Sequence, residues 1–101
     1  MMRSRPMRKR ARVDHNQAEV VFALRTAGAF VQSLATVGDG CPDLLVGFQG
    51  ETYLMEIKDG RKPPSARKLT EDEGRWHERW KGGACAVVKS QIEALEMIGA
   101  M

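Results

Sequence analysis

The chain has 101 residues, of which 43% are hydrophobic and 29% charged, and its 16 Lys and Arg against 13 Asp and Glu give a formal net charge of +3. This length allows one small domain with a modest core, and the basic balance suits a polyanionic partner. Cys41 and Cys85 have neither metal-ligand spacing nor a disulfide framework. With no signal-peptide pattern and no long apolar run, we expect a cytoplasmic protein that has no membrane segment.

Residues 1–13 are expected to form a disordered basic arm, because they hold six Lys and Arg and almost nothing to bury. Arms of this kind bind nucleic-acid backbones through counterion release. Arg8, Lys9 and Arg10 are the expected DNA contacts within it, and the alternative is a merely solvated tail.

From Asp14 the pattern turns helical. Asp14 or Asn16 can cap the start, and Asn16 with Glu19 makes a pair that resembles a capping box. Apolar side chains then recur at helical spacing until Gly28, namely Val20, Val21, Leu24 and Ala27.

Residues 29–37 predict a first strand, which Gly38-Asp39-Gly40 breaks. The two glycines give this turn the freedom to let a phosphate backbone approach the next strand. Asp39 in such a turn is more typical of a turn former than of a ligand.

Two apolar runs on either side of Gln49-Gly50 predict a β-hairpin, because glycine supplies the positive φ that a two-residue loop needs. With that loop, Phe48 pairs with Glu51. Counting outward places Asp43 opposite Glu56 on one face of the sheet, and period two adds Lys58 to that face.

Other loop lengths change this outcome. A loop longer by one residue would send Glu56 and Lys58 to the other face, whereas a four-residue loop would pair Asp43 with Lys58 and restore the site. The register of the hairpin therefore decides whether Asp43, Glu56 and Lys58 share one face of the sheet.

Two opposed carboxylates repel each other, and their burial is costly unless a positive charge neutralises them. Oxygen ligands from Asp43 and Glu56, with water and phosphate in the other positions, suit Mg²⁺ better than Zn²⁺, and Mn²⁺ can substitute. Lys58 would then orient a water, lower its pKa or hold the scissile phosphate. The alternative is a pair of solvated strand ends, but Glu56 and Lys58 alternate with Met55 and Ile57 in a run that is apolar on both faces.

Residues 59–68 predict a basic loop with neither regular helix nor strand. Its cations would contact phosphates of a nucleic acid bound beside Asp43 and Glu56: Arg61, Lys62, Arg67 and Lys68. The alternative is a merely solvated loop.

Thr70 and Glu73 predict a capping box that opens a second helix. Trp76 and Trp80 in this helix are more typical of core residues that pack it on the sheet than of base-stacking platforms. A short strand over 84–89 and a last helix capped by Ser90 complete the order α-β-β-β-α-β-α.

Pro42-Asp43 followed by Glu56-Ile57-Lys58 resembles the motif of the PD-(D/E)XK nuclease superfamily. Gly40-Cys41-Pro42-Asp43, the Leu69-Thr70 helix entry and the later strand look more closely like stand-alone phage and bacterial VRR-NUC proteins. The bare Asp…Glu-x-Lys pattern is weak, whereas the ordered set of elements is more specific. The resemblance implies an α/β, restriction-endonuclease-like core with a mixed sheet flanked by helices, and a nuclease domain over 14–101.

The resemblance also implies a metal site in which Asp43 and Glu56 hold one or two Mg²⁺ or Mn²⁺ ions and the Ile57 carbonyl adds a ligand. An acid on the first helix often completes that site, so Glu19 is either a catalytic metal ligand or a helix cap, with Gln17 a weaker neighbour. Members often carry Gln in the second helix, where this chain has Glu73 and Gly74, so we assign no role to that helix.

The implied function is a metal-dependent DNA endonuclease that attacks a phosphodiester with a metal-activated water. Stand-alone members resemble Holliday-junction resolvases, which implies branched DNA as the substrate, a homodimer, and a phage or bacterial source. A restriction-like enzyme on linear duplex and a non-catalytic basic DNA-binding module remain as alternatives.

Overall fold

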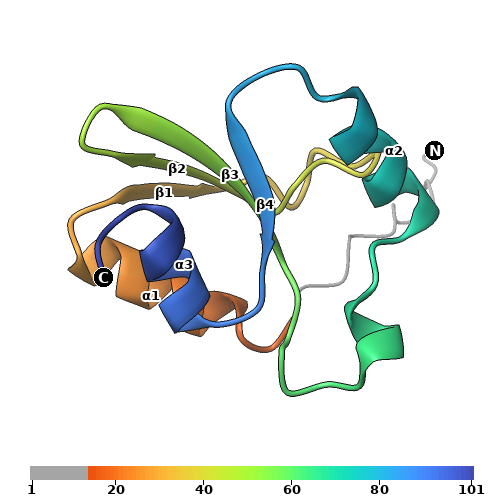
Figure 1. Cartoon of the computed structure of the whole chain (residues 1–101), viewed down its shortest axis with the longest axis horizontal. Coiled ribbons are helices and arrows are strands. Elements are labelled where there is room, and N and C mark those ends of the chain that lie inside the picture. Colours follow the sequence, from red (N-terminus) through yellow and green to blue (C-terminus); the bar gives the residue numbers. More distant parts are fainter. Residues whose placement is uncertain (1–13) are drawn as a thin grey trace, which may run out of the picture.

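The computed structural model describes residues 14–101, which form a four-stranded sheet with three helices (Figure 1). The observed order confirms the predicted α-β-β-β-α-β-α. The elements are α1 (Gln17–Thr26), β1 (Phe30–Ser33), β2 (Leu44–Phe48), β3 (Glu51–Ile57), the 3₁₀ turn η1 (Pro64–Arg67), α2 (Glu71–Arg79), β4 (Ala84–Val88) and α3 (Gln91–Met97).

The sheet is mixed, with strand order β1-β2-β3-β4. β1 and β3 each pair antiparallel with β2, while β4 runs parallel to β3. A parallel neighbour requires a long crossover, and the chain makes it through η1 and α2 (Figure 1).

The β2–β3 hairpin has the predicted two-residue loop, since Phe48 pairs with Glu51. Gln49 and Gly50 both have positive φ, 49° and 83°, which is the backbone of the turns that match the twist of the flanking strands. The loop length is what aligns the two strands at their far end, where the candidate site lies.

The hydrophobic core lies between one face of the sheet and the helices α1 and α3 (Figure 1). Its central members are the alternate strand residues Leu44, Val46, Met55, Ile57 and Val88, packed against Val20 and Leu24 of α1 and Ala94 and Ile98 of α3. Because side chains alternate along a strand, the residues between these core positions point to the opposite face, which is the face of Asp43 and Glu56.

Three local expectations are corrected. The first strand ends at Ser33 rather than at residue 37. Leu34 still donates to the Asp43 carbonyl at 2.7 Å, but the Val37 N–H donates to the Leu34 carbonyl at 3.0 Å and closes a turn. Asn16 precedes α1 but its side chain does not cap the helix. The basic loop contains one 3₁₀ turn, η1.

The second helix does not pack its aromatic residues into the core. α2 has no buried residue, and the core contains neither Trp76 nor Trp80. Figure 1 shows α2 standing off the end of the sheet. The predicted capping box is confirmed, with Thr70 and Glu73 each accepting from the other's backbone N–H, so local bonds hold the start of this helix.

Within residues 14–101, none of the helices combines the length and the apolar character needed to cross a bilayer.

Candidate active site

The two carboxylates predicted at the head of the hairpin face each other. Leu44 lies opposite Met55, so the next step of the same register sets Asp43 opposite Glu56. Asp43 Oδ2 accepts a hydrogen bond of 2.7 Å from the backbone N–H of Ile57, which ties the residue before β2 to the end of β3. The register of the two-residue loop is confirmed, and the one-residue slip is excluded.

Lys58, the residue directly after β3, lies beside this pair. Its Nζ lies 3.8 Å from Glu56 Oε2 and donates a hydrogen bond of 2.9 Å to Glu73 Oε1 on α2. The Asn16 side-chain amide donates to the Lys58 carbonyl at 3.0 Å and to the Lys89 carbonyl at 3.2 Å. The backbone that carries Lys58 is thus pinned from the start of α1.

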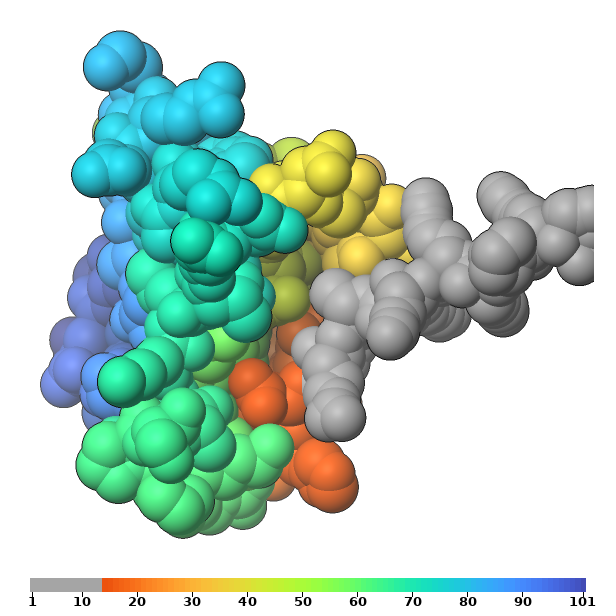
Figure 2. Space-filling model, turned by 90° about the vertical axis from the view of Figure 1, so that its right-hand side faces the viewer, coloured from red at the N-terminus to blue at the C-terminus, as the bar shows by residue number. Residues whose placement is uncertain are grey.

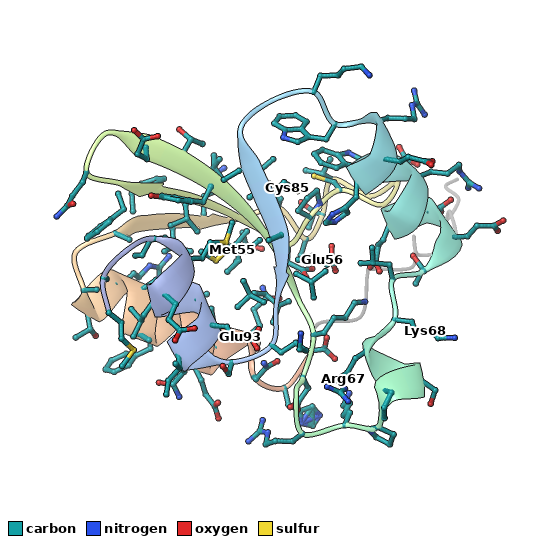
Figure 3. All side chains as sticks on the ribbon, viewed as in Figure 1. Met55, Glu56, Arg67, Lys68, Cys85 and Glu93 are labelled. Atoms are coloured by element: carbon teal, nitrogen blue, oxygen red, sulfur yellow. The ribbon has the colours of Figure 1, made fainter. Side chains whose placement is uncertain are left out.

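These groups line a hollow of about 580 Å³. Its walls come from the turn before β2, the end of β3, the basic loop and the start of α2, and Figure 2 shows α2 beside the loop that precedes β2. In Figure 3, Glu56 lies on the α2 side of the sheet and Met55 on the α3 side. The site therefore lies on the face that the core leaves free.

The nearby positive charge does not balance the carboxylates of Asp43 and Glu56. Burial, followed by the charge of Asp43, raises the pKa of Glu56 to about 10, and burial also raises the pKa of Asp43. Glu56 is 2% exposed, and its Oε1 has no hydrogen-bond partner in the part of the chain that the structure describes. A cation beside these oxygens would remove both the repulsion and the unpaired atom.

Lys58 and Glu73 form the charged side of the site. Burial alone lowers the pKa of Lys58, but the hydrogen bond and charge of Glu73 and the charge of Glu56 raise it overall. Burial raises the pKa of Glu73, yet hydrogen bonds from Thr70 N–H and Lys58 lower it below its ordinary value. The lysine is therefore an ammonium held by a carboxylate on α2.

The donor set fits a hard divalent cation that keeps part of its water. Within residues 14–101, no three His, Cys, Asp or Glu side chains gather closely enough to enclose a metal ion. The N–H and C=O of one strand residue point to the same edge, so the Ile57 carbonyl faces the Asp43 side together with its N–H. Two carboxylates, one carbonyl and water are ligands that Mg²⁺ accepts.

The structure does not bring Glu19 to this hollow. α1 packs on the opposite face of the sheet, and Glu19 lines another hollow there, 3.9 Å from Arg61. Its neighbour Gln17 lines a third hollow, beside β1. We therefore leave both out of the ligand set proposed below.

The predicted DNA contacts fall into three groups. Lys62 and Lys68 line the active-site hollow, with Lys62 paired to Asp14 at 3.2 Å, and Figure 3 shows Lys68 on the loop to the right of Glu56. Arg61 and Arg67 line the neighbouring hollow near the start of α3. The third group, Arg8, Lys9 and Arg10, lies outside the described residues.

The sequence reasoning missed three side chains that the fold brings to the site. Glu73 was read only as a cap, although the same oxygen accepts from Thr70 and Lys58. Asp14 lines the hollow as well. Asn16 binds two carbonyls far along the chain, and nothing in its local sequence distinguishes that from helix capping.

The mixed sheet with the Asp…Glu-x-Lys residues at one end defines a domain of the PD-(D/E)XK nuclease class. No protein-family model and no curated protein matches the sequence. A solved structure described as a VRR_NUC domain matches with a TM-score of 0.60 and 27% sequence identity, over 82% of this chain and 94% of that one. This likeness in fold and sequence supports the identification of the chain as a VRR-NUC nuclease domain.

Proposed function

We propose that the protein is a metal-dependent DNA endonuclease that hydrolyses phosphodiester bonds at the Asp43–Glu56 pair. The observation that carries the proposal is the buried pair of opposed carboxylates, with one oxygen unpartnered and an ammonium beside it. A folded protein tolerates such an arrangement where a cation or a substrate completes it.

Asp43, Glu56 and the Ile57 carbonyl are the proposed ligands of Mg²⁺, with Mn²⁺ able to replace it. A bound ion would supply a more acidic water and charge stabilisation at the phosphate. Lys58 orients the nucleophile or stabilises the charge that develops on the phosphate, and its ion pair with Glu73 fixes the position of the ammonium.

The proposed substrate is branched DNA, cut by a symmetric homodimer. The support is the resemblance of the motif set to resolvase-like members, and the small size of the domain, which suits a two-fold pair acting on two strands. Lys62 and Lys68 in the hollow provide phosphate contacts, and the basic arm adds Arg8, Lys9 and Arg10.

The decisive experiment compares cleavage of a labelled four-way junction, linear duplex and single-stranded DNA in Mg²⁺, Mn²⁺ or EDTA. We expect junction cleavage that needs the metal and that falls about a hundredfold or more in Asp43→Asn and Glu56→Gln. Glu51→Gln, at the exposed opposite end of β3, is the matched control and should cut normally.

A second readout separates metal binding from cleavage. Mg²⁺ should raise the unfolding temperature of the natural protein and of Glu51→Gln, but not that of Asp43→Asn, because a ligand that binds only the folded state stabilises it. Sedimentation with and without junction DNA tests the dimer. Cutting of linear duplex with sequence preference would indicate a restriction-like enzyme, and DNA binding with no cutting would indicate a non-catalytic module.

A further inference from the structure

The chain's two tryptophans lie stacked at the end of α2, Trp76 within the helix and Trp80 directly after it, outside the hydrophobic core. Trp76 and Trp80 are one helical turn apart, with ring centroids 5.0 Å from each other and planes inclined by only 15°. Trp80 is 40% exposed. An aromatic pair of this size, left at the surface of a helix with no buried residue, indicates a binding surface rather than packing.

The outer ring of the pair is held in place by the turn that follows α2. Trp80 Nε1 donates a hydrogen bond of 2.9 Å to the Gly83 carbonyl. Gly82 lies so close that a Cβ there would come within 2.2 Å of Trp80 Cζ2. The indole is therefore fixed before any ligand arrives, which lowers the entropic cost of binding to it.

The tryptophans line a hollow of about 480 Å³ that adjoins the active site. Asp39 and Asp72 line both hollows, and the Gly40 backbone touches that of Asp72 so closely that a Cβ would lie 2.3 Å from its carbonyl oxygen. One surface thus runs from the Asp43–Glu56 pair across this contact to the two indoles.

The charges of the second hollow leave one cation available. Arg75 is occupied by Asp72 and by Glu71, the latter at 3.7 Å. Arg79 also lines the hollow but forms no ion pair with any residue of 14–101. Indole rings that line a hollow beside a free guanidinium match the base and the phosphate of one nucleotide.

We propose that the Trp76–Trp80 hollow binds an unpaired nucleobase of the DNA strand whose backbone passes through the active-site hollow, with Arg79 on an adjacent phosphate. The inference rests on the proposed function in one respect, the choice of DNA as the ligand. It assigns to α2 the recognition of DNA whose bases are already unstacked, such as a single strand or a branch point.

The test measures binding without metal, so that no cleavage occurs. A labelled oligothymidine is compared, by anisotropy in EDTA, with a strand of equal length in which the central nucleotides are abasic. We expect the natural protein to bind the intact strand at least about fivefold more tightly, the effect of one stacked base. Both tryptophans lie at this site, so quenching of intrinsic fluorescence by the intact strand alone would locate the base there.

Three variants complete the test. Trp80→Ala should lose the preference for the intact strand, Trp80→Phe should keep most of it, and Arg79→Ala should weaken both strands alike. Phe22→Ala, an aromatic on α1 that is 72% exposed, is the matched control and should change nothing. Far-UV circular dichroism checks that each variant is folded.

Equal binding of the two strands by the natural protein, or a preference that survives Trp80→Ala, would overturn the assignment. Failure of the nuclease proposal is distinguishable, because a protein that never cuts any DNA can still prefer the intact strand. Conversely, cleavage of DNA without a preference for the intact strand would overturn only the Trp76–Trp80 site and leave the nuclease proposal standing.

Discussion

Glu73 links the capping of α2 to the position of the Lys58 ammonium, because one carboxylate oxygen accepts from both Thr70 N–H and Lys58 Nζ, each at 2.9 Å. Glu73→Gln keeps an oxygen for the cap but removes the charge that holds the lysine. A hydrogen bond to a charged group contributes about 1.5–3 kcal/mol, so we expect cleavage to slow by about 10- to 100-fold while DNA binding changes little.

The measurement is the single-turnover cleavage rate beside the affinity for DNA in EDTA. Glu71→Gln is the matched control, since that carboxylate lies in the same turn of α2 but is 89% exposed and, among residues 14–101, forms an ion pair only with Arg75. An equal loss of binding and cleavage in Glu73→Gln would show that this residue holds DNA or the fold rather than Lys58.

The sequence predicted the site residues that share one short hairpin and missed those that come from elsewhere. Asp43, Glu56 and Lys58 follow from the period of a strand and a two-residue loop, both of which are local. Glu73 and Asn16 carry strong local signals for capping, and those signals conceal their bonds to Lys58. Glu19 lies away from the active-site hollow, and only the packing of α1, which no local signal indicates, decides which face of the sheet it reaches.

Among the elements, α2 depends on its cap more than α3 does, because α2 contributes nothing to the core whereas α3 buries Ala94. Thr70 and Ser90 each accept from the N–H three residues on. Loss of an N-cap costs about 1 kcal/mol. We expect Thr70→Ala to unfold α2 locally with little effect on global stability, and to slow cleavage by releasing Glu73.

Amide hydrogen exchange over residues 71–79, together with urea unfolding and cleavage rates, tests this expectation. Ser90→Ala is the comparison: it should lower the free energy of global unfolding and leave exchange in α2 unchanged. Loss of global stability in Thr70→Ala equal to that in Ser90→Ala would mean that α2 is part of the cooperative core.

The order of elements was predictable because each boundary carries a turn or cap signal, but their extents and contacts were not. The first strand ends at Ser33, because the Val37 N–H donates to the Leu34 carbonyl and closes a turn over residues 34–37, which the apolar run in the sequence does not indicate. The two tryptophans have the spacing of a core face, yet neither belongs to the hydrophobic core. Hydrophobic periodicity indicates a shared face, whereas tertiary packing decides what that face contacts.

For the whole molecule, the charge is divided unevenly along the chain. All thirteen Asp and Glu and ten of the sixteen Lys and Arg belong to residues 14–101, so this domain has a formal charge of −3 and residues 1–13 bring the total to +3. Within the domain, several cations are already paired, Lys58, Arg61 and Lys62 among them. Attraction to DNA should therefore depend heavily on the first thirteen residues.

We expect replacement of Arg3, Arg5, Arg8, Lys9, Arg10 and Arg12 by Gln in the full chain to weaken duplex binding strongly. The slope of log affinity against log salt should fall by up to about five units, because each phosphate neutralised contributes about 0.9. Two triple variants act as matched controls, one changing Arg8, Lys9 and Arg10 and the other Arg3, Arg5 and Arg12. Equal losses of affinity in the two triple variants would indicate diffuse attraction. A larger loss in the variant of Arg8, Lys9 and Arg10 would support the predicted contacts. An unchanged slope in the sixfold variant would show that residues 14–101 alone carry the affinity.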